Sequence, residues 1–215
     1  MRYRLVVFDW DGTILDSAST IAECIRLAAR DVGLPVPSEE QAKHVIGLGL
    51  HDALRGAVPD LAPERVADFV EHYRQHFRSR EATMGLFAGM RELIERLSGE
   101  RTLGIATGKS RRGLDRALET TGLKPYFRAS RCADETHPKP HPAMLLELIA
   151  ELGVPMENAL MIGDTSHDLE MARAAGVDAL AVTYGAHAAR GLLECAPRGC
   201  VASVEELGRW LAANG

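Results

Sequence analysis

From residue 84 to its end the sequence alternates short, mostly apolar stretches with amphipathic stretches of about ten residues. The short stretches predict strands at 102–106, 128–130, 159–162 and 179–182. The longer ones predict helices at 90–97, 111–121, 142–152, 166–175 and 204–213. Strands that alternate with helices form a parallel sheet with helices on both faces. We therefore expect an α/β fold with a Rossmann-like, doubly wound parallel sheet.

Another strand is predicted near the start of the chain, in the continuous apolar run at residues 5–8. Between this strand and the next, residues 16–83 contain only helix candidates, at 17–30, from 38, at 50–57 and from 63 to about 80. The first strand cannot fold as a separate unit, so the helical block interrupts a single α/β domain. We predict a core of residues 1–15 and 84–215 with an inserted all-helical cap of residues 16–83, placed as a lid would be.

The composition is ordinary for a globular protein and argues against several partners. Hydrophobic residues make up 46% and charged residues 26% of the 215 residues, and the net charge of -5 disfavours a nucleic-acid surface. No apolar stretch approaches the roughly 20 residues that a membrane span needs. The start shows no signal-peptide pattern, so we expect a cytoplasmic protein. Cys24, Cys132, Cys195 and Cys200 form no CxxC pair and are expected to be unpaired thiols.

Two carboxylates follow the first predicted strand directly. Asp9 and Asp11 stand two residues apart, so in extended backbone their side chains point to the same side. Gly12 lets the chain turn immediately afterwards. Ligands of open α/β sheets bind at the carboxyl ends of the strands. The pair is therefore a candidate reactive site, although an ordinary Asp-Gly turn would use the same residues.

Three further segments follow predicted strands and should reach the same edge of the sheet. Thr107 and Gly108 lead into the start of a helix, whose free amides suit a phosphate. Lys139 lies between two prolines that stiffen its loop. Asp164 follows a strand, and Asp168 comes four residues later. Each segment is weak evidence alone, since a lone lysine is usually solvated, but together they place acids beside a cation.

Crowded carboxylates require a hard cation, and Mg²⁺ prefers oxygen ligands and commonly bridges to a substrate phosphate. A site of acids, a lysine, a threonine and a helix start suits phosphoryl transfer, which depends on positioning and charge neutralisation. One carboxylate could attack phosphorus, because aspartate can form an aspartyl-phosphate. The other could protonate the leaving oxygen and then activate water.

With these four segments the sequence resembles the haloacid dehalogenase-like hydrolase superfamily. The motifs Asp9-Trp10-Asp11-Gly12-Thr13, Thr107, Lys139 and Gly163-Asp164-Thr165-Ser166-His167-Asp168 match its four motifs in order. The resemblance covers essentially the whole chain, including the helical insert. It implies a catalytic core with a cap that chooses the substrate, and a Mg²⁺ cofactor.

The resemblance also implies a role for each matching residue. Asp9 would be the nucleophile, and Asp11 the general acid/base and a Mg²⁺ ligand through its backbone carbonyl. Asp9 and Asp164 would bind Mg²⁺ directly, and Asp168 would lie in the outer shell of the metal or hold Lys139. A last set would bind the phosphoryl group: the backbone amides of Trp10, Asp11 and Gly108, the Thr107 hydroxyl, and Lys139, which would also orient Asp9.

The second acid separates branches of the superfamily, because its dehalogenases and phosphonate-cleaving members lack it. Asp11 therefore favours hydrolysis of a phosphate ester, and the chain looks most like phosphoglycolate phosphatase and its relatives. We expect a small phosphorylated metabolite as substrate and a monomer or homodimer. The alternatives left open are a phosphomutase of the β-phosphoglucomutase type, a pyrophosphatase and a non-catalytic phosphate-binding protein.

Residues in the cap are expected to select the substrate. The segment 45–50 lies where related caps present a substrate loop, and Gly47 is its central candidate. Lys43, Arg55 and Arg74 are weaker candidates for contact with a substrate carboxylate. We also expect the Trp10 side chain, between the two acids, to shape the entrance of the site.

Overall fold

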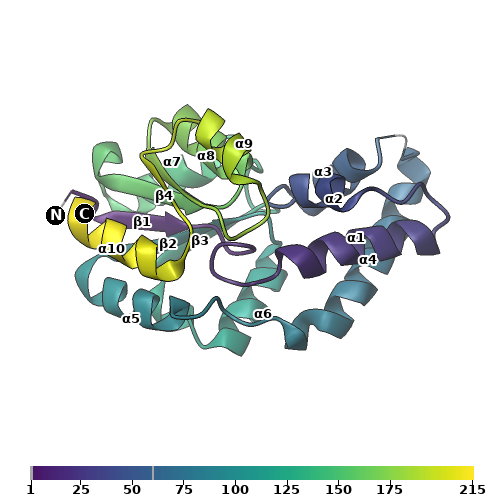
Figure 1. The fold of residues 1–215 in the computed structure, drawn as a ribbon, viewed down its shortest axis with the longest axis horizontal. Coiled ribbons are helices and arrows are strands. Elements are labelled where there is room, and N and C mark those ends of the chain that lie inside the picture. Colours follow the sequence, from purple (N-terminus) through teal and green to yellow (C-terminus); the bar gives the residue numbers. More distant parts are fainter. Residues whose placement is uncertain (1, 60) are drawn as a thin grey trace.

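A six-stranded parallel sheet forms the centre of the computed structural model, which describes residues 2–59 and 61–215 (Figure 1). Its strands are β1 (Leu5–Phe8), β2 (Thr102–Thr107), β3 (Ala129–Cys132), β4 (Ala159–Gly163), β5 (Asp178–Val182) and β6 (Gly199–Val201). They lie in the order β3-β2-β1-β4-β5-β6. The order runs outward in opposite directions from β1, as in the doubly wound Rossmann arrangement, and confirms the predicted fold class.

The central strand β1 separates two hydrophobic layers. Val6 and Phe8 pack into one layer, and Leu5 and Val7 into the other, as alternation along a strand requires. The first layer is covered by α5 (Met90–Glu100), α6 (Arg111–Thr121) and α10 (Val204–Asn214). The second is covered by α7 (Ala143–Leu152), α8 (Ser166–Ala175) and α9 (Ala189–Glu194). Burial on both faces explains the continuous apolar run of β1.

Two elements near the C-terminus were not predicted from the sequence. Strand β6 has three residues and pairs with β5, opposite Leu180 to Val182. Helix α9 has six residues and one buried side chain, Leu192. Both are too short to show a period in the sequence, and β6 forms because the edge of β5 is available to it.

The segment after β1 forms its own helical layer, at one end of the molecule (Figure 1). It contains α1 (Ala18–Asp31), α2 (Glu39–His44), α3 (Leu50–Ala57), α4 (Val66–Arg80) and the short 3-10 helices Pro63–Arg65 and Glu81–Thr83. Ile25, Leu54 and Phe69 are among the buried side chains of its separate hydrophobic core. A capping box of Ser38 and Gln41 begins α2, close to the predicted helix start at 38. The insert is therefore helical, as predicted, and packs around its own interior.

Two connecting segments join the helical insert to the core side by side. The amide of Asp16 donates to the carbonyl of Gly85 at 2.9 Å, and that of Phe87 donates to Ile14 at 3.2 Å. These bonds lie close to the proposed domain boundaries at 15/16 and 83/84. Backbone hydrogen bonds therefore pair the two segments where the insert leaves the core.

The four cysteines occur as free thiols, as expected. Among the described residues, no helix is long and apolar enough to cross a membrane.

Candidate active site

The candidate residues from four strand ends lie together at the carboxyl edge of the sheet. Asp9 follows β1, Thr107 ends β2, and Asp164 follows β4, while Lys139 comes from the loop after β3. Strand register aligns these ends, because Phe8 of β1 lies opposite both Ile105 of β2 and Ile162 of β4. The parallel sheet therefore brings together side chains that are far apart in the sequence.

Lys139 lies between two buried carboxylates. Its Nζ donates to Asp9 Oδ1 at 2.6 Å and lies 2.6 Å from Asp168 Oδ1. The side chains are all at most 1% exposed, so solvent does not screen these charges. Burial alone would lower the pKa of Lys139, but the two carboxylates outweigh it and raise that pKa. The two carboxylates thus favour the charged ammonium of Lys139, which fixes the orientation of Asp9.

The other carboxylate oxygen of Asp9 has different surroundings. Asp9 Oδ2 is buried and has no hydrogen-bond partner among the described residues. Burial raises the pKa of Asp9 well above its usual range, and Asp168 and Asp164 add to this effect against the attraction of Lys139. An orphaned, buried carboxylate oxygen is costly unless a cation or a reacting group takes it.

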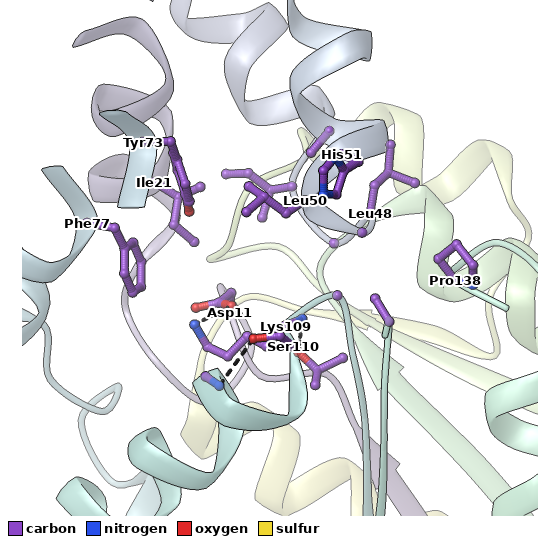
Figure 2. Close-up of a pocket in the computed structure, with 18 of the residues that line it drawn as sticks. Asp11, Ile21, Leu48, Leu50, His51, Tyr73, Phe77, Lys109, Ser110 and Pro138 are labelled. Carbon is purple, nitrogen blue, oxygen red and sulfur yellow. Dashed lines mark hydrogen bonds and ion pairs between the residues drawn. The ribbon is translucent and has the colours of Figure 1, made fainter. Parts of the chain in front are cut away.

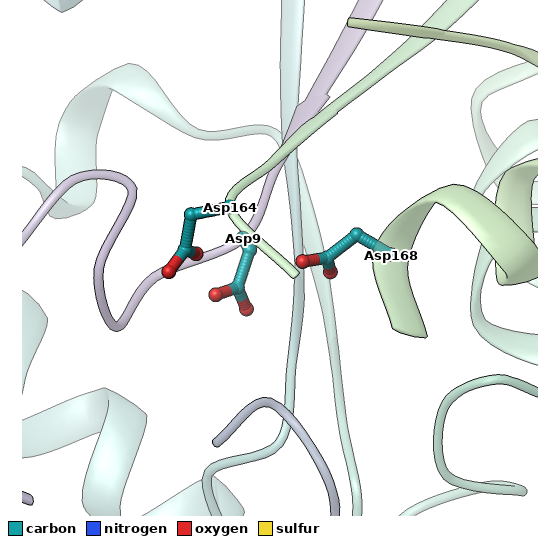
Figure 3. A group of neighbouring side chains, drawn as sticks. All are labelled: Asp9, Asp164 and Asp168. Atoms are coloured by element: carbon teal, nitrogen blue, oxygen red, sulfur yellow. The ribbon is translucent and has the colours of Figure 1, made fainter. Parts of the chain in front are cut away.

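Three carboxylates converge closely enough to hold a cation. Asp9, Asp164 and Asp168 each present an oxygen within 4.8 Å of the others (Figure 3). Burial and the nearby Asp168 raise the pKa of Asp164 to about 7. This all-oxygen donor set, in which Asp9 Oδ2 has neither a hydrogen bond nor an ion pair among the described residues, fits Mg²⁺ by charge and by ligand type.

Asp164 is held from two directions by residues of the core. Thr13 Oγ1 donates to Asp164 Oδ1 at 2.8 Å, and the amide of Ala186 donates to Oδ2 at 2.7 Å. A Cβ atom on Gly12, or on Gly185, would stand 2.2 Å from Asp164 Oδ2. Gly12 also has a φ of +84°, which favours glycine. Because neither glycine has a side chain, the Asp164 carboxylate can occupy this space.

Asp11 is bound through both of its oxygens. Ser17 Oγ donates to Oδ1 at 2.8 Å, and Lys109 Nζ lies 2.9 Å from Oδ2. Ser17 occupies the N-cap position of α1 but makes no capping bond there, because its hydroxyl serves Asp11. The second acid is therefore oriented independently of Asp9.

A cavity of about 530 Å³ lies between this floor and the helical insert (Figure 2). Asp9, Asp11 and Thr107 line its floor. The insert contributes the opposite wall: Ile21, Ile25, Val45, Ile46, Leu48, Leu50, Tyr73 and Phe77 are among its residues. The cavity therefore has acids at one end and mostly apolar side chains at the other.

The sequence profile of the haloacid dehalogenase-like hydrolase family matches residues 6–182. The chain belongs to the haloacid dehalogenase-like hydrolase family. The match spans the strand ends that carry Asp9, Thr107, Lys139 and Asp164, and also the helical insert.

Three named relatives are similar over most of the hydrolase. "Probable phosphatase IndB" of Dickeya dadantii is 37% identical over 94% of this chain and 91% of its own length. "Tyrosine-protein kinase PtkA" of Mycobacterium tuberculosis is 32% identical over 85% of this chain and 62% of its own length. "Phosphoglycolate phosphatase" of Aliivibrio fischeri is 31% identical over 85% of each chain.

A solved structure supports the fold of the hydrolase. A protein described as a predicted phosphoglycolate phosphatase from Haemophilus somnus 129PT superposes with a TM-score of 0.87 at 24% identity. The superposition covers 98% of this chain and 99% of that one, so both the core and the insert are included.

The loop 45–50 of the hydrolase closes directly onto the core, with Gly47 in the wall of the cavity. A Cβ atom on Gly108 would stand 2.6 Å from the carbonyl oxygen of Gly47 and 2.5 Å from that of Leu48. Gly47 itself has a φ of +93°. Two backbones approach this closely only because residue 108 is glycine.

The expectation for the Trp10 side chain was wrong. It is completely buried in the core layer with Phe8 and Ile14, so it cannot shape the entrance of the site. Trp10 lies between two acids at a strand end, and its side chain points inward against the sheet. Of the three weaker cap candidates, Arg74 lines the cavity, whereas Lys43 and Arg55 do not.

A histidine contact between the insert and the core was not anticipated. The carbonyl of His44, at the end of α2, lies 2.9 Å from His167 Nε2 and 3.0 Å from His187 Nε2. The amide of Ser166 donates to His187 Nδ1, so His187 carries its proton on Nε2 and donates to His44. Burial lowers the pKa of His187 to about 4, which keeps it neutral.

The sequence reasoning also missed Lys109 and the loop that carries Ala186. Lys109 follows Thr107 and Gly108 directly, so its position in the motif was an available signal. No local signal marks Ala186, because its contact with Asp164 depends on how the loop after β5 folds back over β4.

Proposed function

We propose that this hydrolase is a Mg²⁺-dependent phosphatase that hydrolyses a small phosphorylated metabolite through an aspartyl-phosphate on Asp9. One observation carries the proposal. Lys139 holds Asp9 Oδ1, and Oδ2 is left buried and unpartnered among the described residues at the floor of the cavity. A carboxylate fixed by one oxygen and free at the other is prepared to attack phosphorus.

In the first half-reaction, Asp9 Oδ2 forms a bond to phosphorus while the bond to the ester oxygen breaks. The leaving oxygen takes a proton from Asp11, which lines the same cavity. Asp11 is bound to Lys109 and Ser17 in this structure, so substrate binding has to release one of these contacts before proton transfer.

In the second half-reaction, the Asp11 carboxylate takes a proton from water as the water oxygen attacks phosphorus. The bond between phosphorus and Asp9 breaks, and inorganic phosphate and the original Asp9 carboxylate are restored. The proton that Asp11 gave to the alcohol is thereby replaced from water, so the cycle balances.

The remaining floor residues bind the transferred group. The Thr107 hydroxyl, the Gly108 amide and the amides of Trp10 and Asp11 are donors for the phosphoryl oxygens. Lys139, buried beside Asp9, neutralises charge that develops there. Asp168 acts through Lys139, whose Nζ lies 2.6 Å from Asp168 Oδ1.

We assign the Mg²⁺ site to Asp9, the backbone carbonyl of Asp11, and Asp164. When bound, the ion supplies positive charge that neutralises the phosphoryl oxygens. Thr13 and the amide of Ala186 orient Asp164 toward this role.

Two relatives support hydrolysis, because the names of the Dickeya dadantii and Aliivibrio fischeri proteins both contain "phosphatase". The Mycobacterium tuberculosis relative is named a kinase, and it is the longer protein, of which this chain covers 62%. With Asp9 as the nucleophile, the phosphoryl group would also pass to a hydroxyl acceptor in place of water. Water as the acceptor is therefore the part of the proposal that the assay tests. We also propose a cytoplasmic location.

The test is phosphate release from a panel of 2-phosphoglycolate, sugar phosphates, nucleotides and pyrophosphate, with and without Mg²⁺. Asp9→Asn serves as the matched control, since it keeps the shape of the side chain. We expect release that depends on both Mg²⁺ and Asp9. No release from any compound contradicts a phosphatase.

The alternatives give different results in the same panel. Release from pyrophosphate alone indicates a pyrophosphatase. Interconversion of sugar monophosphates that needs a sugar bisphosphate primer indicates a phosphomutase. Binding of phosphate without any turnover indicates a non-catalytic protein.

A further inference from the structure

The cavity is larger than a two-carbon phosphate requires. Its volume of about 530 Å³ lies within the range of roughly 300–1,000 Å³ that is typical of clefts for drug-sized ligands. The phosphoryl group occupies only the floor, beside Asp9 and Thr107. Most of the space therefore belongs to the alcohol part of the substrate.

The wall that faces this alcohol is largely apolar. Helix α1 contributes Ile21 and Ile25, the loop before α3 and its first residue contribute Leu48 and Leu50, and α4 contributes Tyr73 and Phe77 (Figure 2). The last four keep part of their surface exposed. An apolar group that covers this surface releases its water, whereas a carboxylate placed there loses hydration without a partner.

Polar side chains interrupt the apolar wall: His51 and Asp52 of α3 line it, and so does Tyr73 of α4. The hydroxyl of Tyr73 is directed toward the floor near Asp11 (Figure 2) and makes no hydrogen bond within the described residues. The ring of Tyr73 stacks on that of Phe77, with centroids 5.9 Å apart, which fixes its orientation. A substrate can therefore offer one hydrogen-bonding group at this position.

The cations around the cavity are poorly placed for a short carboxylate. Lys109 is paired with Asp11, and Arg116 is paired with Glu81 at 3.0 Å. Arg74, Arg78 and Arg112 also line the cavity, but all three are exposed to solvent. A short acid attached to a phosphoryl group on Asp9 would therefore meet lysine and arginine side chains that are already paired or exposed to solvent.

We propose that the preferred substrates are phosphate monoesters whose alcohol carries an aromatic or heteroaromatic ring with a hydrogen-bonding group, and not short phosphorylated acids. The ring lies against the wall formed by Leu50, Tyr73 and Phe77, and its polar group faces the Tyr73 hydroxyl. This inference rests on the proposed phosphatase function and names its substrate class.

Matched substrate pairs test the inference with the full chain and Mg²⁺. Uridine or adenosine 5′-monophosphate is compared with ribose 5-phosphate, since both lose a primary alcohol and differ chiefly in the base. 2-Phenylethyl phosphate is compared with propyl phosphate in the same way. We expect kcat/KM to be at least about tenfold higher for the ring-bearing member of each pair, because even one methylene in an apolar pocket is worth about 10-fold.

Substitutions of residues on α4 test whether this wall causes the preference for ring-bearing substrates. Tyr73→Ala should lower the ratio within both pairs at least about threefold, and Tyr73→Phe should lower it for the nucleotide pair alone. Gln75→Ala is the matched control, because Gln75 is exposed on the same helix and does not line the cavity. Thermal unfolding of each variant shows that it is folded.

The outcomes separate this inference from the proposed function. Phosphate release from ribose 5-phosphate, propyl phosphate or 2-phosphoglycolate that equals or exceeds release from the ring-bearing esters overturns the inference and leaves the phosphatase intact. Ratios that do not change in Tyr73→Ala also overturn it. No release from any ester overturns the phosphatase and the inference together.

Discussion

Lys109 connects the carboxylate of Asp11 to the helical insert. Its Nζ lies 2.9 Å from Asp11 Oδ2 and 4.8 Å from the centre of the Phe77 ring on α4. The side chains of Lys109 and Asp11 are each only 11% exposed. A cation shared between a carboxylate and an aromatic face couples the position of the proposed general acid to the position of the insert.

Replacement of Lys109 should therefore impair proton transfer. We expect Lys109→Met to lower kcat/KM for alkyl phosphates at least about tenfold, because general acid catalysis contributes about 10²–10⁴. The loss should be smaller for p-nitrophenyl phosphate, whose leaving group needs no proton. Steady-state kinetics with both substrates measures this. Arg112→Met, which removes an exposed cation from the same cavity, is the control, and equal losses for both substrates would argue against the role.

Crowding around Asp164 predicts a specific defect in metal binding. In Gly185→Ala the new Cβ would stand 2.2 Å from Asp164 Oδ2, so the carboxylate has to move. We expect the Mg²⁺ concentration for half-maximal activity to rise about 10- to 100-fold, as is usual when the support of a metal ligand is disturbed. Gly191→Ala, where a Cβ meets no atom within 4 Å, should behave as the wild type. An unchanged Mg²⁺ requirement in Gly185→Ala would contradict the assignment of Asp164.

The raised pKa of Asp164 predicts how Mg²⁺ affects stability. In the metal-free protein the Asp164 carboxyl group keeps its proton up to about pH 7. In the unfolded chain the same group loses its proton near pH 4. The folded state therefore binds more protons in between, and stability falls as the pH rises through 7. We expect a loss on the order of 1 kcal/mol between pH 6 and 8.

Added Mg²⁺ should offset this loss, because it takes the place of the proton. Differential scanning fluorimetry at both pH values, with chelator or with Mg²⁺, should show a larger Mg²⁺ stabilisation at pH 8. Asp164→Asn should abolish the difference. Equal stabilisation at the two pH values would show that the ion does not bind where Asp164 titrates.

The histidine contact should hold the insert in the position that it has in this structure, over the floor of the cavity. Two imidazoles of the core, His167 and His187, converge on the carbonyl of His44 at 2.9 and 3.0 Å. In the double variant His167→Phe/His187→Phe we expect KM to rise several-fold, with a smaller change in kcat, because each lost hydrogen bond is worth about 1 kcal/mol. Substitution of His72→Phe on α4, which does not line the cavity, gives a comparison for the ring change alone. A change in kcat without one in KM would exclude a role in closure.

The sequence allowed the fold class and the meeting of the strand ends to be predicted, for a clear physical reason. Asp9, Thr107 and Asp164 follow apolar runs, and the ends of parallel strands share one edge of a sheet. The helical insert was equally visible, because residues 16–83 lack any strand pattern.

The partners of these residues could not be predicted in the same way. The contacts of Ala186 with Asp164 and of His187 with His44 join segments whose meeting depends on tertiary packing. The prediction for the Trp10 side chain was wrong because a local sequence pattern does not show which face of the turn is buried. Strand β6 forms through pairing with β5 and has no signal of its own.

The central claim is that Asp9 carries the phosphoryl group, and trapping that group tests it most directly. Asp11→Ala should form the phosphoenzyme from p-nitrophenyl phosphate and hydrolyse it slowly, because no base activates water. Mass spectrometry of the acid-quenched protein should then find a phosphoryl group on the peptide that contains Asp9, and none in Asp9→Asn/Asp11→Ala. A phosphoryl group on another residue, or substantial turnover by Asp9→Asn, would contradict the account.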